Sequence, residues 1–230
     1  MFPFSDNLKG ASGTTVIAAL ILLMAVAHAP SFLDPSLGYQ IVRAYGFVPL
    51  EFSVAPWSSI YKIVTSVFLH GDLFHVAGNC LFLWVFGRSL LRLFGAVPFL
   101  LAFPLLGAAG LFLHWVIYPS SRVPVIGASG AVATLMGAYL ALFPSARIKI
   151  FALFGGFGAP FTAPAWAFLL YWGGLELLSL LGGTGEADRV AYAVHVGGFI
   201  AGVMAAIIWK VAYPFAEETL SEFSASAFKS

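Results

Sequence analysis

Six apolar stretches, each close to the length of a bilayer crossing, constrain the fold of this 230-residue chain more than any other feature. A spanning helix needs about 20 predominantly apolar residues. Lipid tolerates only helices and closed barrels, and long unbroken apolar runs exclude a barrel. Only 9% of the residues are charged, against about 25% in soluble domains. The sequence therefore predicts an all-α polytopic bundle of six transmembrane helices, at approximately 13–33, 67–88, 96–118, 125–143, 161–181 and 190–213.

The sequence predicts one membrane domain, because no internal repeat or low-complexity tract divides it. The opening "MFPFSDNLKG" is followed by no evident small-residue cleavage site, so we expect a retained first helix rather than a signal peptide. We expect a single domain over 1–230, with a core at roughly 13–213 and short tails at both ends. The single Cys80 lies within a predicted span, where we expect it to fill core space.

The distribution of basic residues predicts the orientation. With the N-terminus inside, seven Lys and Arg fall on the inner side and four on the outer side, which favours two cytoplasmic termini. The inner set is Lys9, Arg88, Arg92, Arg147, Lys149, Lys210 and Lys229, and the outer set is Arg43, Lys62, Arg122 and Arg189. We expect a multi-pass protein of a cell inner membrane. No basic tract suggests a nucleic-acid partner, and the apolar composition makes the lipid bilayer the expected surrounding.

Three connections differ from short turns. About 35 residues separate the first two spans, and their mix of aromatic, proline and charged residues predicts a segment half-buried at the membrane interface. The stretch "RIKIFALFGGFGAP" is expected to be a second interfacial segment. "GGTGEADR", before the last span, is expected to be a flexible polar loop.

Topology predicts that four polar residues converge. Spans 2, 4 and 6 start from the same face, which brings His75 and Asn79, Ser129, and His195 to similar depth on the outer side. At 1.5 Å of rise per residue, Ser129 and His195 both lie about 8 Å below the outer interface. Polar groups at membrane depth are costly and usually functional.

Small residues predict which helices touch. Gly130, Ala133, Gly137 and Ala141 form a stripe on the fourth span, and Gly198, Gly202 and Ala205 form one on the sixth. Such stripes allow close helix approach, which would bring Ser129 beside His195.

This convergence is chemically suited to nucleophilic catalysis. Neutral His195 can take the proton of Ser129, while the open N–H groups at the start of the fourth span, together with Asn79 and His75, can stabilise an oxyanion. No acid is obviously placed to orient His195, and nothing in the sequence links Glu176 to it. Taken singly, each of these residues is more often structural than catalytic. A serine in a membrane helix usually forms a hydrogen bond with its own backbone. An intramembrane histidine usually packs against a neighbouring helix or forms a hydrogen bond to it. His28, His70 and His114 are expected to be interfacial or structural.

Other site motifs are absent from the sequence. "GASGA" is not the G-x-S-x-G elbow of soluble hydrolases, and there is no H-E-x-x-H metal site, no intramembrane aspartate pair and no phosphate loop. No cofactor or metal is expected.

In these residues and their order, the chain resembles the rhomboid family of intramembrane serine proteases. His75 to Asn79 match the family's H-x-x-x-N motif; Gly127, Ser129 and Gly130 match its G-x-S-G motif; and His195 and Gly198 match its A-H-x-x-G motif, across roughly 40–210. The resemblance implies Ser129 as nucleophile, His195 as general base, and oxyanion stabilisation by Asn79 and His75. It also implies cleavage of transmembrane protein substrates in or near their membrane segment, and a mobile fifth helix and following loop as substrate gate.

Three positions depart from the family pattern. Val194 replaces an alanine, Leu91 replaces a frequent glutamate, and Ala133 stands where the family often has an aromatic that stacks on the histidine. Loss of the glutamate predicts lower stability, and Ala133 leaves the orientation of His195 dependent on another aromatic. The alternatives are an inactive rhomboid-like protein that binds membrane proteins without cutting them, and a small transporter. A transporter would need polar lining through the inner half of the bundle, where spans 2, 4 and 6 are apolar.

Overall fold

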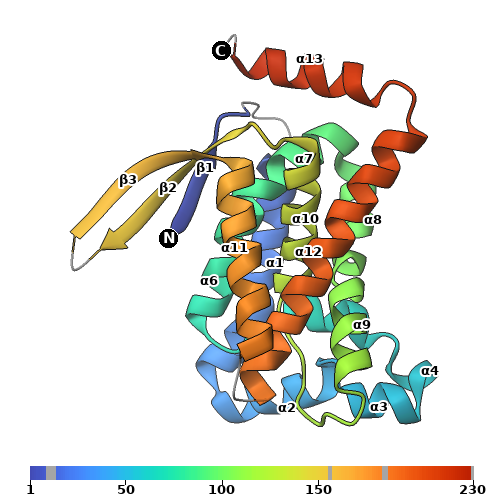
Figure 1. The fold of residues 1–230 in the computed structure, drawn as a ribbon. Coiled ribbons are helices and arrows are strands. Elements are labelled where there is room, and N and C mark those ends of the chain that lie inside the picture. The colour runs from blue at the N-terminus through green and yellow to red at the C-terminus, as the bar shows by residue number, and fades with distance from the viewer. Residues whose placement is uncertain (9–13, 155–156, 183–185, 229–230) are drawn as a thin grey trace.

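A helical bundle surrounds one short central helix in the computed structural model, which describes residues 1–8, 14–154, 157–182 and 186–228 (Figure 1). Within these residues, five helical segments are long and apolar enough to cross a membrane, and one apolar helix is shorter. The predicted six-helix architecture is confirmed. The spans are α1 (Thr14–Leu33); α6 (Leu73–Phe82), η2 (Leu83–Gly87) and α7 (Arg88–Phe94) in succession; α8 (Ala96–Leu106) with α9 (Ala108–Ile117); α10 (Ser129–Leu142); α11 (Ala165–Gly182); and α12 (Glu186–Ala212).

The central helix α10 is nearly all buried and begins later than predicted. The sequence predicted a helix from residue 125, whereas α10 starts at Ser129. The cause is Gly127, whose φ of 116° lies in the left-handed region and ends any continuous helix before it. Ser129 is therefore the first residue of the helix rather than a member of its second turn.

The long first connection folds into short helices. These are α2 (Pro35–Tyr45), α3 (Pro49–Val54), α4 (Pro56–Ser59), α5 (Lys62–Thr65) and the 3₁₀ helix η1 (Ser66–Phe68). Proline occupies the first turn of three of them, where its missing N–H costs nothing. Large apolar side chains such as Val54 and Trp57 remain exposed. These exposed side chains fit the predicted interfacial position.

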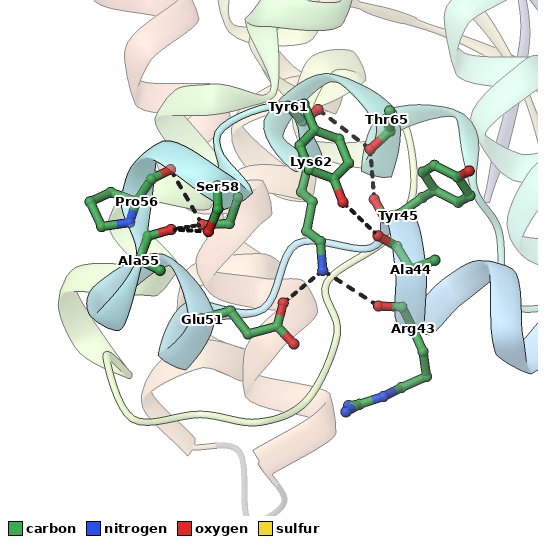
Figure 2. Close-up of polar contacts among 11 residues, drawn as sticks. Arg43, Ala44, Tyr45, Glu51, Ala55, Pro56, Ser58, Tyr61, Lys62 and Thr65 are labelled. Carbon is green, nitrogen blue, oxygen red and sulfur yellow. Dashed lines mark hydrogen bonds and ion pairs between the residues drawn. The ribbon is translucent and has the colours of Figure 1, made fainter.

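Polar contacts hold this connection together (Figure 2). Lys62 Nζ donates to Glu51 Oε2 at 2.6 Å and to the Arg43 carbonyl at 3.4 Å. The Thr65 hydroxyl donates to the Tyr45 carbonyl at 2.7 Å. Lys62 is thus a buried cation with its partners supplied by two neighbouring helices, and the segment has a defined fold.

A three-stranded antiparallel sheet was not predicted. Its order is β1-β2-β3, from β1 (Phe2–Asp6), β2 (Arg147–Phe154) and β3 (Phe157–Pro164). In β2, Ile148 and Ile150 are buried while Arg147 and Lys149 are exposed. This period-two alternation is typical of a half-buried strand, and the second predicted interfacial segment is a hairpin that extends beside the bundle (Figure 1). The predicted helical membrane bundle is confirmed, and this small sheet is an addition to it.

A buried carboxylate ties the N-terminal strand to the bundle. Asp6 Oδ2 accepts hydrogen bonds from the Tyr139 hydroxyl at 2.7 Å and from Ser89 Oγ at 2.8 Å. Burial raises the pKa of Asp6 above its usual value, although both hydrogen bonds act to lower it. β1 is therefore joined to α7 and α10 by a polar contact as well as by its pairing with β2.

The C-terminal helix α13 (Ala216–Phe228) also contacts the bundle. The Arg92 guanidinium lies 3.5 Å from the centre of the Phe223 ring, and Phe143 stacks on Phe223 at 5.1 Å. α13 and the base of the sheet lie at one end of the bundle, while α2 to α4 lie at the other (Figure 1). Both ends of the described chain therefore share the side opposite the first connection.

Candidate active site

An extended segment leads into the candidate nucleophile at the start of α10. Phe47 and Val125 form an isolated antiparallel bridge with N–H···O distances of 3.0 and 2.7 Å. Two residues later, the Gly127 N–H donates to the Ser66 carbonyl at 2.9 Å. These backbone bonds fix the approach to Ser129, whose N–H stands among the unpaired donors of the first helical turn.

Gly127, two residues before Ser129, makes room for His75. A Cβ at position 127 would lie 2.6 Å from Nε2 of His75 and 3.7 Å from Nδ2 of Asn79. Only glycine fits both this contact and the positive φ. The two predicted oxyanion residues on α6 are thereby brought directly against the turn that carries Ser129.

The glycine after the serine brings α12 close. A Cβ at Gly130 would fall 2.7 Å from Cγ1 of Val194, and a Cβ at Gly198 would overlap the Gly130 carbonyl oxygen. Gly137 and Gly202 make equally close backbone contacts farther along the same pair of helices. The predicted close contact between the fourth and sixth spans is confirmed.

One cavity of about 560 Å³ is lined by all four predicted polar residues. Ser129 at the start of α10, His195 on α12, and His75 and Asn79 on α6 line it together. Within the described residues, no hydrogen bond joins Ser129 to His195. Catalytic hydrogen bonds are often long before substrate binds and tighten in the complex. The serine, histidine and amide can thus face one substrate carbonyl.

Asn79 contributes a free donor to this cavity. The residue is 7% exposed, and among the described residues its Nδ2 has no hydrogen-bond partner. Buried amide donors are nearly always paired, because an unsatisfied one costs about 1–3 kcal/mol. This amide donor, in the cavity that Ser129 also lines, is available to a ligand oxygen.

An acid does contact the candidate base, contrary to the sequence analysis. Glu176 Oε2 lies 2.8 Å from His195 Nδ1, and the two side chains are 15% and 18% exposed. Glu176 comes from α11 and lines the same cavity. The sequence places these residues 19 positions apart on different helices, and only the packing of α11 on α12 brings them together.

The aromatic that Ala133 does not supply comes from α11. Ala133 is buried in the cavity wall, and the Trp172 ring lies against His195 with centroids 5.9 Å apart and planes tilted by 39°. Trp172 precedes Glu176 by one helical turn. Sequence reasoning missed both contacts, although their i, i+4 spacing placed them on one helical face.

The other two residues that depart from the family pattern are buried, and the lower stability expected from Leu91 stays a prediction. Leu91 is 2% exposed within the main core, and Val194 is 4% exposed against Gly110 and Gly130. The loop that follows α11 includes residues 183–185, which lie outside the described residues. The predicted gate, a mobile fifth helix with its following loop, stays a prediction.

Two further histidines, His28 and His70, lie beside His75. His28 Nδ1 lies 3.2 Å from the His70 carbonyl, and the His70 and His75 rings are 5.1 Å apart. Burial lowers the pKa of His70 to about 4, so its ring is neutral at physiological pH. In the described ranges, no cluster of three or more His, Cys, Asp or Glu side chains could hold a metal ion.

The fold defines a helical, multi-pass integral membrane protein, and Ser129 and His195 line one of its cavities. Residues 58–211 match the Rhomboid domain, and the chain belongs to the rhomboid family. It is 34% identical over 159 residues to Rhomboid protein 1, mitochondrial, of Saccharomyces cerevisiae, covering 64% of this chain and 41% of the relative.

Two further relatives show the range of the family. The chain is 27% identical over 213 residues to the human presenilin-associated rhomboid-like protein, mitochondrial, covering 91% of this chain and 49% of the relative. A shorter match, 35% over 80 residues, covers 35% of this chain and 15% of Rhomboid protease GluP of Bacillus subtilis. The chain spans less than half the length of these curated relatives.

Proposed function

We propose that this protein is an intramembrane serine endopeptidase that cleaves transmembrane protein substrates in or near their membrane segment. Ser129 is the nucleophile and His195 the general base. Asn79, His75 and the Ser129 N–H form the oxyanion pocket. One rhomboid-type domain, residues 1–230, carries the whole site and needs no cofactor or metal.

The chemistry follows from the residue types in the cavity. His195 takes the proton as Ser129 Oγ attacks the scissile carbonyl, and it returns that proton to the leaving amine. The oxyanion accepts hydrogen bonds from the amide and backbone donors. Water entering the cavity then hydrolyses the acyl-enzyme, with His195 again acting as base.

The unpartnered amide of Asn79 supports this proposal most directly. A purely structural role for the α6 polar pair would pair that buried donor with a protein acceptor. Instead, Nδ2 stays unsatisfied in the cavity that contains Ser129 and His195. A developing negative charge on a substrate oxygen would supply the missing acceptor.

The non-catalytic alternative rested on Ala133, which supplies no ring to support the histidine. The Trp172 contact with His195 removes that reason, because an aromatic from α11 occupies the space beside the base. The described geometry therefore favours an active enzyme.

We propose that the protein lies in a cell inner membrane with both termini cytoplasmic. The seven-to-four distribution of basic residues favours this orientation, and β1 and α13 lie at the bundle end away from the first connection (Figure 1). The yeast and human relatives bear the word mitochondrial in their names. Protease protection of a C-terminal tag in sealed vesicles tests the orientation: digestion from the outer side would overturn it.

The test of activity is cleavage in reconstituted vesicles. A panel of single-span substrates with helix-weakening residues in the span and a small residue before the intended cut is incubated with the protein. The wild type should produce a defined fragment. Ser129→Ala and His195→Ala should produce none while melting at the wild-type temperature. Equal cleavage by Ser129→Ala would refute the assignment.

A further inference from the structure

We infer that Glu176 is a positioning residue that, together with Trp172, holds the His195 ring in its catalytic orientation from the neighbouring helix α11. This inference deepens the proposed function and rests on it. It adds a carboxylate and an aromatic to a site for which the sequence suggested only a serine and a histidine.

The hydrogen bond between Glu176 and His195 determines which nitrogen of the His195 ring can accept a proton. Glu176 Oε2 lies 2.8 Å from His195 Nδ1. A carboxylate can only accept hydrogen bonds, so Nδ1 carries the proton and donates it. The lone pair is then on Nε2, the nitrogen that remains free to take a proton from Ser129. Without the carboxylate, the ring could equally adopt the tautomer that leaves no lone pair there.

The burial of Glu176 and His195 distinguishes their contact from an exposed surface ion pair. Both side chains are mostly buried, at 15% and 18% exposed, and both line the cavity of Ser129. A carboxylate on a membrane-spanning helix is costly and is retained where it has a partner. The contact also places a negative charge beside the ring that becomes positive during the reaction. That charge stabilises the imidazolium selectively when proton transfer occurs.

Trp172 restricts the remaining freedom of the ring. One hydrogen bond fixes a nitrogen but leaves the imidazole able to rotate about that contact. The indole lies 5.9 Å away with a 39° tilt and also touches Phe199 on α12, at 5.7 Å. Trp172 and Glu176 stand one turn apart on α11, so a single helical face supplies both contacts. Ala133, on α10, is too small to perform this task.

This arrangement makes the base dependent on the position of α11. Ser129 and His195 belong to α10 and α12, which pack closely through glycine-to-backbone contacts. Both supports of the His195 ring come from α11 instead. A displacement of α11 would therefore leave nucleophile and base in place but release the ring.

The labelling kinetics of a fluorophosphonate probe test this inference without a known substrate. The maximal labelling rate reports activation of the serine, and the probe concentration for half-maximal rate reports access and binding. We compare wild type, Glu176→Gln, Glu176→Asp and Trp172→Leu in vesicles, each with its melting temperature. Glu51→Gln is the matched control, because Glu51 also accepts a hydrogen bond from a basic side chain, Lys62, but lies in the first connection.

Glu176→Gln should lower the maximal rate by about 100-fold with little change in the half-maximal concentration. Glu176→Asp should recover part of the loss, Trp172→Leu should lose about tenfold, and Glu51→Gln should match wild type. Wild-type maximal rates in the folded Glu176→Gln and Trp172→Leu variants would overturn the inference. Labelling that survives Ser129→Ala would instead overturn the proposed function.

Discussion

Gly198 of α12 lies directly against the carbonyl of Gly130 of α10, so close that a methyl group at position 198 would overlap the carbonyl oxygen. This contact places His195, one turn earlier on α12, beside the serine that precedes Gly130. The spacing between the proposed nucleophile Ser129 and the proposed base His195 therefore depends on a contact between two backbones.

Gly198→Ala should separate the two helices and lower both stability and activity. Overpacking of a tight core costs about 1–3 kcal/mol, and a small shift of the base lowers the rate steeply. Gly174→Ala is the matched control, because a methyl group there meets nothing within 4 Å. Thermal melting and labelling rates of both variants check this prediction; wild-type behaviour of Gly198→Ala would contradict the close contact.

Asn79→Ala should reduce activity without a comparable loss of stability. Removal of one oxyanion donor costs about 100- to 1000-fold in rate. Removal of a hydrogen-bonded buried amide also destabilises a fold, but Nδ2 has no partner among the described residues. Substrate cleavage and melting measured on the same sample separate the two effects. A large fall in melting temperature with unchanged cleavage would assign Asn79 a structural role.

The free energy of unfolding should fall as pH rises, because Asp6 loses its proton. A carboxyl whose pKa is raised by folding favours the folded state below its ordinary value of 3.8 and loses that contribution as pH rises through the raised value. Asp6→Asn, which stays neutral, should therefore gain stability relative to wild type from acidic to neutral pH. Unfolding of both proteins at pH 4 to 8 checks this; a gap that narrows with rising pH would contradict it.

Asp6→Ala provides the complementary test of the same contact. It leaves the Tyr139 and Ser89 hydroxyls without their acceptor, at a cost of about 1–3 kcal/mol. The loss should appear at every pH when the free energy of unfolding of Asp6→Ala is compared with that of Asp6→Asn, because neither side chain titrates. Equal stability of the alanine and asparagine variants would show that these hydrogen bonds contribute nothing.

His70 should have the opposite pH dependence. Its pKa falls from 6.5 in the unfolded chain to about 4 in the buried site, so its contribution to stability is present above pH 6.5 and is lost as pH falls toward 4. The full loss is about 3 kcal/mol. His70→Gln should remove this share of the acid sensitivity in a pH series of unfolding measurements. The same slope in wild type and variant would contradict the assignment.

Much of the fold follows from the sequence because lipid imposes strong constraints. Apolar length predicts the spans, and the parity of spans brings Ser129, His195, His75 and Asn79 to one side. The glycine stripes then predict which helices touch. Each of these arguments depends on one helix or on helix order, which the sequence shows directly.

The missed features depend on how elements pack. The contact of Glu176 with His195 requires the rotation of α11 relative to α12, which no spacing within either helix determines. The late start of α10 follows from the positive φ of Gly127. The sheet was missed because "RIKIF" is short, although its alternation of charged and apolar residues was a usable signal.

Mapping of the fluorophosphonate adduct tests the central claim most directly. Wild-type protein in vesicles is labelled and digested, and the modified residue is identified by mass spectrometry. The account predicts one adduct, on Ser129, which disappears in His195→Ala although the serine is still present. An adduct on another residue, or Ser129 labelling that persists without His195, would contradict a serine activated by that histidine.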